Sequence, residues 1–127
     1  GRVVIGAMAP TAGLALRSLH CRAAAAAGLV VPPNPIARFN LSHLALVQQV
    51  LPSARVEKRR DAYLFPATHA ALAYYAAEYL DQLEPTPSGQ EQRAALLAAI
   101  SPLLDAARAR DGHLRVDMTA GCFVADL

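Results

Sequence analysis

Residues 10–28 read PTAGLALRSLHCRAAAAAG, and this stretch decides the predicted fold class. Alanine has the highest helix propensity, because its side chain loses no rotamer entropy when the backbone orders. The stretch contains the unbroken alanine run Ala23–Ala27. Pro10-Thr11 offers an N-cap, and Gly28 suits the position that follows a helix C-terminus. These residues predict a helix over 12–27.

One face of this helix is predicted to be buried. Leu16, Leu19, Ala23 and Ala27 follow the three-to-four residue spacing of an apolar stripe. An alanine buries only about one methyl group, worth about 0.8 kcal/mol, so the stripe favours close approach of a second helix over bulk. We therefore expect this face to pack against another helix.

Further helices are predicted by the same spacing and by capping residues. Residues 34–51 begin at the cap Asn34-Pro35 and end before Pro52, and a third helix spans 69–83. A fourth helix begins near Gly89, with Ser88 as the N-cap of a capping box. Ser101-Pro102 either kinks this helix or starts a fifth one, which ends at Gly112.

The tail carries a weak strand pattern. Leu114, Val116 and Met118 alternate with charged residues, and residues 2–8 are a candidate partner strand. We therefore expect an all-α fold, a helical bundle of four to five mostly antiparallel helices with at most a small terminal strand pair. The expected organisation is a single helical domain over residues 1–127, cut from a longer protein.

Charge and cysteine content limit the partners and the compartment. Twelve basic and ten acidic residues leave a net charge of +2, which is too small to indicate a polyanionic partner. Residues 3–16 lack charge, but Pro10 interrupts them and they are too short to span a bilayer. Cys21 and Cys122 do not make a disulfide framework. We expect an intracellular, cytoplasmic protein with no membrane partner. The alanine-rich composition and the dominance of arginine over lysine are typical of a GC-rich genome.

The sequence lacks the residue patterns of common catalytic and metal sites. Its four histidines and two cysteines show no metal-ligand spacing, and Ser42-His43 is only a neighbouring pair. Glycine-rich phosphate loops are absent as well. We therefore expect no enzymatic activity, no metal and no cofactor.

The connection between Pro52 and Pro66 is the predicted recognition element. Long connections in compact domains are usually functional, although a short helix over 54–63 is an equal alternative. Basic and aromatic side chains gather in it, and we take these as the partner-binding residues: Arg55, Lys58, Arg59, Arg60, Tyr63 and Phe65. Glu57 and Asp61 interrupt the basic run, which favours a protein partner over nucleic acid.

All four tyrosines fall between residues 63 and 79. Tyr75 and Tyr79 lie one helical turn apart, so both rings can line a pocket. The simpler explanation is that each ring is half buried while its hydroxyl stays in water.

Three functions are consistent with these features. The preferred one is a non-catalytic helical protein–protein interaction or assembly module that binds a protein partner or itself, within a larger protein or oligomer. The alternative is a small-molecule-binding regulatory domain with a tyrosine-lined pocket. Nucleic-acid binding through the basic residues 55–60 comes third.

Overall fold

The computed structural model describes residues 1–127 and shows a mixed α/β protein. The all-α prediction is wrong, and so is the helical bundle: four helices and two shorter helical segments (46% together) accompany five strands in two antiparallel sheets (21%). The strands pair with partners far away in the sequence, which local helix periodicity does not register. Residue contacts divide the chain into two compact units, a sheet unit and a helical unit. The single-domain organisation stays a prediction.

The helices and strands follow one another in a mixed order. In chain order they are β1 (Arg2–Met8), α1 (Leu14–Ala26), η1 (Pro35–Ala37), α2 (Leu44–Gln48), β2 (Arg55–Arg59), β3 (Ala62–Phe65), α3 (Thr68–Tyr75), η2 (Ala76–Leu80), α4 (Pro87–Asp111), β4 (Leu114–Asp117) and β5 (Ala120–Asp126).

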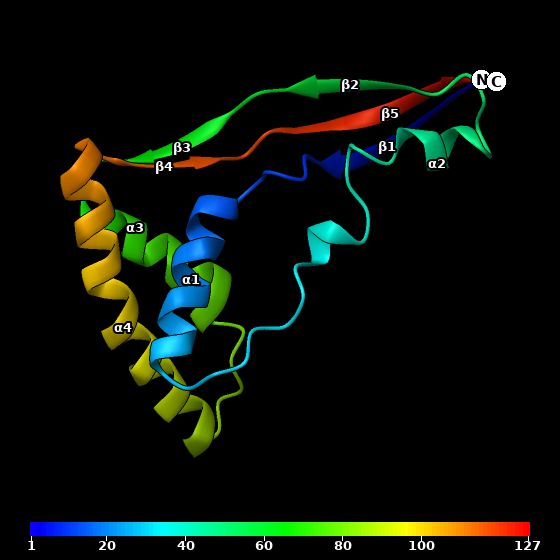
Figure 1. Ribbon diagram of the computed structural model, residues 1–127. Helices are drawn as coiled ribbons and strands as arrows, with labels where there is room; N and C mark the ends of the chain where they lie inside the picture. The colour runs from blue at the N-terminus through cyan, green and yellow to red at the C-terminus, as the bar shows by residue number, and fades with distance from the viewer. The chain divides into compact units, whose positions relative to one another are not determined.

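The sheet unit comprises residues 1–14, 33–63 and 116–127. Its antiparallel sheet has the order β1-β5-β2, so β5 lies in the centre between two edge strands (Figure 1). The chain ends meet, because Leu127 N donates a hydrogen bond of 2.9 Å to the Gly1 carbonyl. A terminal strand pair therefore exists, but β5 is the partner of β1. The predicted tail strand is β4, which pairs with β3.

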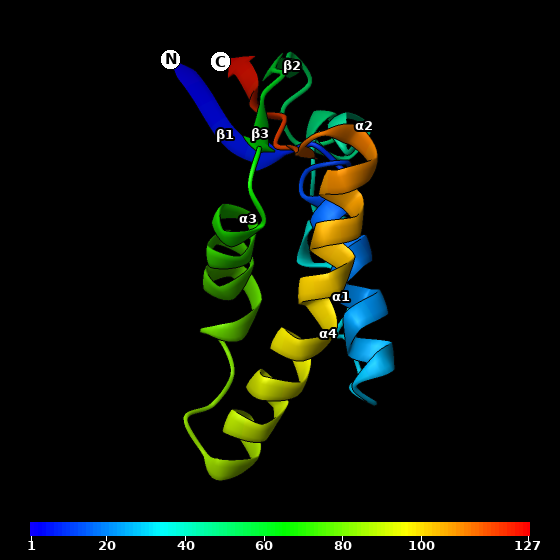
Figure 2. The same ribbon diagram turned by 90° about the vertical axis from the view of Figure 1, so that its left-hand side faces the viewer.

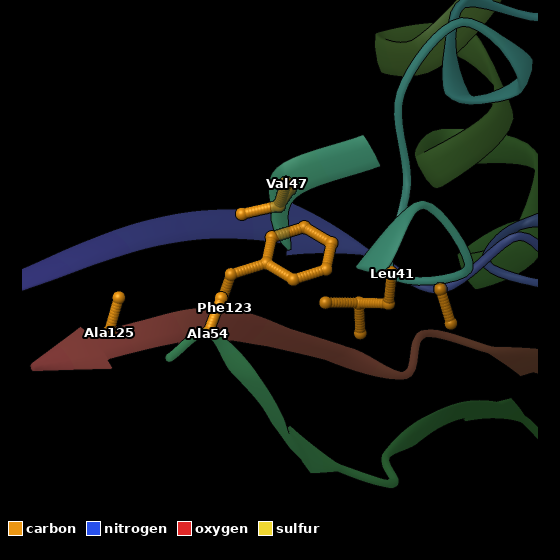
Figure 3. Packing of buried hydrophobic residues seen from close by; sticks show 6 residues of the cluster. Leu41, Val47, Ala54, Phe123 and Ala125 are labelled. Carbon is orange, nitrogen blue, oxygen red and sulfur yellow. The ribbon is translucent and has the colours of Figure 1, made fainter. Parts of the chain in front are cut away.

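The core of the sheet unit lies on one face of this sheet. Phe123 on β5 is fully buried, and Val47 from α2 and Leu41 lie beside its ring (Figure 3). Ala54 and Ala125 belong to the same cluster. Helix α2 and the segment before it thus cover one face of the sheet.

The predicted helix over 34–51 is wrong, because η1 and α2 are separate short segments. The buried Asn40 lies between them, and its side chain bonds neighbouring backbone groups. Its Nδ2 donates to the Ile36 carbonyl at 2.9 Å, and its Oδ1 accepts from Ser42 N at 2.9 Å. Such local bonds offer the backbone an alternative to the helical pattern.

The predicted 53–66 connection is neither a loop nor the alternative helix over 54–63. It forms β2 and β3, and Met118 N donates to the Asp61 carbonyl at 2.9 Å between them. The pairing of β2 with β5 therefore continues across the break at residues 60–61.

The helical unit comprises residues 15–32 and 64–115. Within it, α3 and α4 lie side by side and run antiparallel (Figure 2). The predicted first helix is confirmed as α1, with Leu16, Leu19 and Ala23 buried, whereas Ala27 is only half buried. The predicted third helix forms as α3, followed by the π-helical segment η2.

Helix α4 is one continuous helix that contains Pro102 and ends at Gly112, whose φ of 78° is the left-handed conformation typical of a C-terminal cap. Its end is confirmed, but its start is not. The N-cap is Thr86, whose Oγ1 accepts a hydrogen bond from Gly89 N at 3.0 Å. Ser88 already lies inside the first turn. Pro87 supports Thr86 as the N-cap, because proline is favoured at the first residue of a helix.

We expect Thr86→Ala to lower the free energy of unfolding by about 0.5–2 kcal/mol, because the substitution removes the side-chain acceptor for Gly89 N. The measurement is a urea denaturation curve. Ser88→Ala is the matched control, and it should leave the midpoint unchanged. Equal effects of the two substitutions would contradict the assigned cap.

Candidate functional site

A cavity of about 480 Å³ lies in the helical unit. This volume is within the range of small-molecule sites. Its lining is mainly aliphatic and comes from α1, the segment that follows α1, η2 with the turn after it, and α4. The polar residues of the lining are His20, Tyr79, Gln82 and Gln92. The cavity therefore combines a mainly apolar wall with a few polar side chains.

His20 joins the cavity to a buried tyrosine. The His20 side chain is 8% exposed, and its Nδ1 lies 2.7 Å from the Tyr75 hydroxyl. Its ring stacks on Tyr79 with centroids 4.0 Å apart and planes inclined by 17°. Tyr75 is 0% exposed, and its ring centroid is 5.1 Å from that of Tyr79. These three rings form one packed cluster.

Burial disfavours the charged form of each of the three rings in this cluster. Desolvation raises the pKa of Tyr75 to about 12, with a smaller contribution from Tyr79. Desolvation lowers the pKa of His20, and the positive charge of Arg17 lowers it further. Burial also raises the pKa of Tyr79. A neutral imidazole therefore faces a neutral phenol.

The buried phenol determines which imidazole nitrogen carries the proton. A neutral imidazole has one donor and one acceptor nitrogen. If Nδ1 were the donor, the Tyr75 hydroxyl hydrogen would be buried without an acceptor, which costs about 1–3 kcal/mol. The Tyr75 hydroxyl therefore donates to Nδ1 of His20, and Nε2 carries the hydrogen.

The two predicted pocket tyrosines have different positions. Tyr79 lines the cavity, whereas Tyr75 does not line it and contacts His20 instead. The sequence interpretation missed His20 as a site residue. The signal was present, since His20 follows Leu16 by four residues and precedes Ala23 by three, which places it in the buried stripe.

The predicted partner-binding residues are divided between faces and units. Side chains alternate along a strand, so Arg55 and Arg59 share one face of β2 while Lys58 lies on the other. Arg60 is exposed between β2 and β3, and Tyr63 is exposed on β3. Phe65 belongs to the helical unit, where its ring lies 5.4 Å from that of Tyr74.

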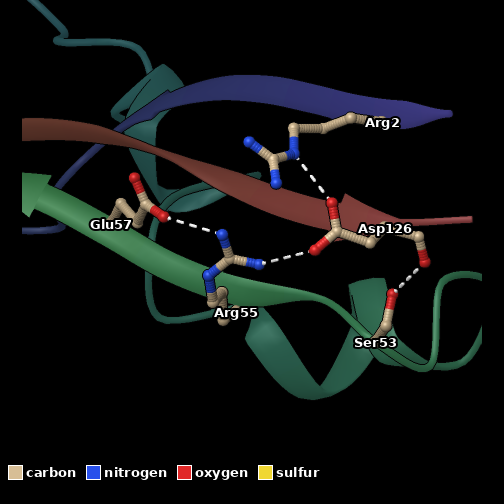
Figure 4. A network of polar contacts seen from close by, with 5 residues as sticks. All are labelled: Arg2, Ser53, Arg55, Glu57 and Asp126. Atoms are coloured by element: carbon tan, nitrogen blue, oxygen red, sulfur yellow. Dashed lines mark hydrogen bonds and ion pairs between the residues drawn. The ribbon is translucent and has the colours of Figure 1, made fainter.

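Arg55 takes part in ion pairs within the sheet unit (Figure 4). Its guanidinium contacts Asp126 at 3.3 Å and Glu57 at 3.1 Å. Asp126 also accepts a 2.7 Å bond from Arg2, and Ser53 Oγ donates to the Asp126 carbonyl at 2.6 Å. The hydrogen bond from Arg2 is the main cause that lowers the pKa of Asp126. Arg55 is thus engaged within its own sheet.

The outer edge of β1 carries unpaired backbone groups. Ala9 N donates to the Thr119 carbonyl, which continues the β1–β5 pairing, while the Met8 carbonyl accepts from Leu41 N on the opposite side. Because backbone groups alternate in direction along an antiparallel strand, those of Arg2, Val4 and Gly6 point away from β5. They have no hydrogen-bond partner in the chain.

The outer edge of β2 carries more charged side chains than the outer edge of β1. The bond from Met118 N to the Asp61 carbonyl directs the groups of Glu57 and Arg59 toward β5, so those of Val56 and Lys58 point outward. Charged side chains on an edge strand oppose pairing with another chain. Lys58, Arg59 and Arg60 supply such charges to the β2 edge.

No three His, Cys, Asp or Glu residues lie together in a way that suits a metal ion. None of the helices combines the length and apolar character needed to cross a membrane. Comparisons with protein-family models, curated proteins and solved structures find no match to this chain.

Proposed function

We propose that this protein is a non-catalytic self-association module in which β1 of one copy pairs with β1 of a second copy. The open β1 edge carries this proposal, because it presents the backbone donors and acceptors of Arg2, Val4 and Gly6 without partners. A strand edge of this kind is a template for pairing with another chain.

The edge is self-complementary in an antiparallel register. A two-fold axis at Val4 places Val4 opposite Val4 of the second copy, and Arg2 opposite Gly6. Residues that point outward then face each other, and each facing pair exchanges both backbone hydrogen bonds. A two-fold interface of this type closes on itself and gives a dimer.

The side chains on this edge favour the same contact. Val4 is 61% exposed, and pairing would bring two valines together at the centre. On the other face of the sheet, Val3 of one copy would lie opposite Ile5 of the second. Arg2 is the only charged residue of β1. The β2 edge, with Lys58, Arg59 and Arg60, would repel a second copy of itself.

The size of the contact indicates a weak dimer. Pairing extends only from Arg2 to Gly6, since Leu41 N already occupies the Met8 carbonyl. Interfaces below about 1,200 Å² are typical of transient association. We therefore expect a micromolar dissociation constant.

The test is sedimentation velocity of the full chain from about 1 µM to about 500 µM, a range in which a weak dimer changes its population. The wild type should shift from monomer to dimer. Val4→Lys should remain monomeric, because two lysines would face each other at the centre of the edge. Val4→Pro should also remain monomeric, because proline removes an N–H that no group in the monomer uses.

Lys58→Pro is the matched control, because it removes an outward N–H from the other edge strand. This variant should associate like the wild type. A wild type that remains monomeric over the whole range would refute the proposal, and so would a Val4→Pro variant that associates normally.

Partner binding through the basic residues 55–60 stays a separate prediction. Binding of a protein partner through Arg59 and Arg60 is tested by the double reversal Arg59→Glu/Arg60→Glu, which should leave β1 self-association intact. Nucleic-acid binding through residues 55–60 also stays a prediction. Its signature would be an affinity that falls steeply with salt.

A further inference from the structure

We propose that the cavity in the helical unit binds a compact, largely apolar ligand through one oxygen acceptor that receives a hydrogen bond from His20 Nε2. The ligand class is an apolar carbonyl compound or carboxylic acid. This binding function goes beyond self-association, and its residues lie in the other compact unit.

The shape and lining of the cavity support a small apolar ligand. Its volume is about 480 Å³, and aliphatic residues such as Leu29, Val31 and Leu96 form most of its wall. Small-molecule sites usually have apolar walls and a few placed polar groups. Tyr79 comes from the π-helical segment η2, and π-helical turns are frequent at functional sites.

His20 supports a ligand in this cavity independently of the cavity's shape and lining. Its side chain is almost completely buried, yet only Nδ1 has a hydrogen-bond partner in the protein. The protein leaves no inaccessible side-chain nitrogen or oxygen without a partner. Nε2 therefore remains accessible, and His20 is a wall of the cavity. A ligand in the cavity can supply the missing partner.

The cluster around His20 selects the chemistry of that partner. The Tyr75 hydroxyl donates to Nδ1, so Nε2 offers an N–H and needs an acceptor. Stacking against Tyr79 holds the imidazole ring in place, which prepares this donor before the ligand arrives. A hydrocarbon would leave the donor unpaired, whereas a carbonyl or carboxylate oxygen would accept its bond.

Arg17 distinguishes a neutral ligand from an anionic one. Its Nη2 donates to the carbonyl of Pro32, a residue of the cavity wall, at 2.6 Å. Its charge also acts on the Tyr79 phenol. A carboxylate in the cavity would be attracted by this guanidinium, and a neutral carbonyl would depend on it less.

The experiment compares naphthalene, naphthamide and naphthoate, which share one apolar body and differ in the acceptor. Binding to the full chain is followed by NMR titration, including the side-chain nitrogen signals of His20. We expect naphthamide to bind about five- to tenfold more tightly than naphthalene, the range of one net hydrogen bond. Its binding should shift the Nε2 signal. Tighter binding of naphthoate that is lost in Arg17→Gln would assign a carboxylate ligand, and equal binding would assign a neutral carbonyl.

The double variant His20→Phe/Tyr75→Phe removes both partners of the buried bond and keeps an aromatic ring at each position. Replacing both partners by apolar groups leaves no orphaned polar atom, so the helical unit should still fold. The variant should bind naphthalene and lose the preference for naphthamide. Gln90→Ala is the control, because Gln90 is exposed on α4 and does not line the cavity, so this variant should keep the preference.

Two results would overturn the proposal. One is the absence of binding of all three compounds to the wild type. The other is a double variant that still prefers naphthamide. Neither result depends on whether the protein self-associates, since the same titration can be repeated with the Val4→Lys variant, which we expect to be monomeric.

Discussion

Gly121→Ala should destabilise the sheet unit by about 3 kcal/mol or more, at the upper end of the effects of overpacking. A Cβ atom at Gly121 would collide with the carbonyl of Glu57 and lie 2.8 Å from Lys58 Cα. Both contacts involve the backbone of β2, which is hydrogen-bonded to β5 and cannot turn aside as a flexible side chain would. The measurement is the free energy of unfolding from urea denaturation.

Gly6→Ala is the matched control for this prediction. Gly6 lies on β1 opposite Cys122, and a Cβ atom there would meet nothing within 4 Å. We expect an effect within about 0.5 kcal/mol, as for other surface substitutions without special contacts. A loss of stability as large as that of Gly121→Ala would show that β5 does not approach β2 so closely.

Phe123→Ala should lower the free energy of unfolding by about 3–5 kcal/mol, the usual range for a buried phenylalanine. The ring is 0% exposed and occupies the centre of the core cluster between Val47 and Leu41 (Figure 3). Truncation would leave a cavity that the surrounding strands and α2 cannot fill completely. Equilibrium denaturation followed by circular dichroism measures the loss.

Phe39→Ala provides the comparison, because the Phe39 ring lies 5.5 Å from that of Phe123 but is 39% exposed. Its truncation removes less buried area, so we expect a clearly smaller loss of stability. Equal losses would contradict the assignment of Phe123 to the centre of the core.

The two proposed functions occupy separate residues. Self-association uses the edge of β1, which β5 holds in place from the other side, whereas ligand binding uses His20 and the helices around it. Val4→Lys and His20→Phe/Tyr75→Phe therefore test different properties of one chain. A protein that lost only one property with each variant would support both assignments.

Helix ends were the most predictable part of this fold, because local residues determine them. Gly28 and Gly112 both adopt positive φ, as expected of glycines that follow a helix. Asn34 caps η1 through a bond from Ile36 N to its Oδ1. The prediction failed where a side chain bonded nearby backbone groups, as at Asn40, and where Thr86 took the capping position expected for Ser88.

The strands were harder to predict, because their patterns are weak or absent. The alternation at 114–118 correctly indicated a strand, but its partner is β3 rather than residues 2–8. Strand β5 shows no alternation, since Phe123, Val124 and Ala125 are all buried. A short run of buried residues without alternation cannot be told from part of a buried helix by periodicity alone.

The sequence by itself determined the position of α1 and the end of α4, because helix propensity, apolar spacing and the glycines that follow helices act within a few residues of chain. Only the tertiary structure decided that β1 and β2 are edge strands, that Arg55 pairs with Asp126, and that His20 connects Tyr75 to a cavity. These features depend on contacts between residues far apart along the chain. Such contacts form only when the whole chain has folded, since hydrophobic burial and backbone pairing select among many partners that look equivalent in the sequence.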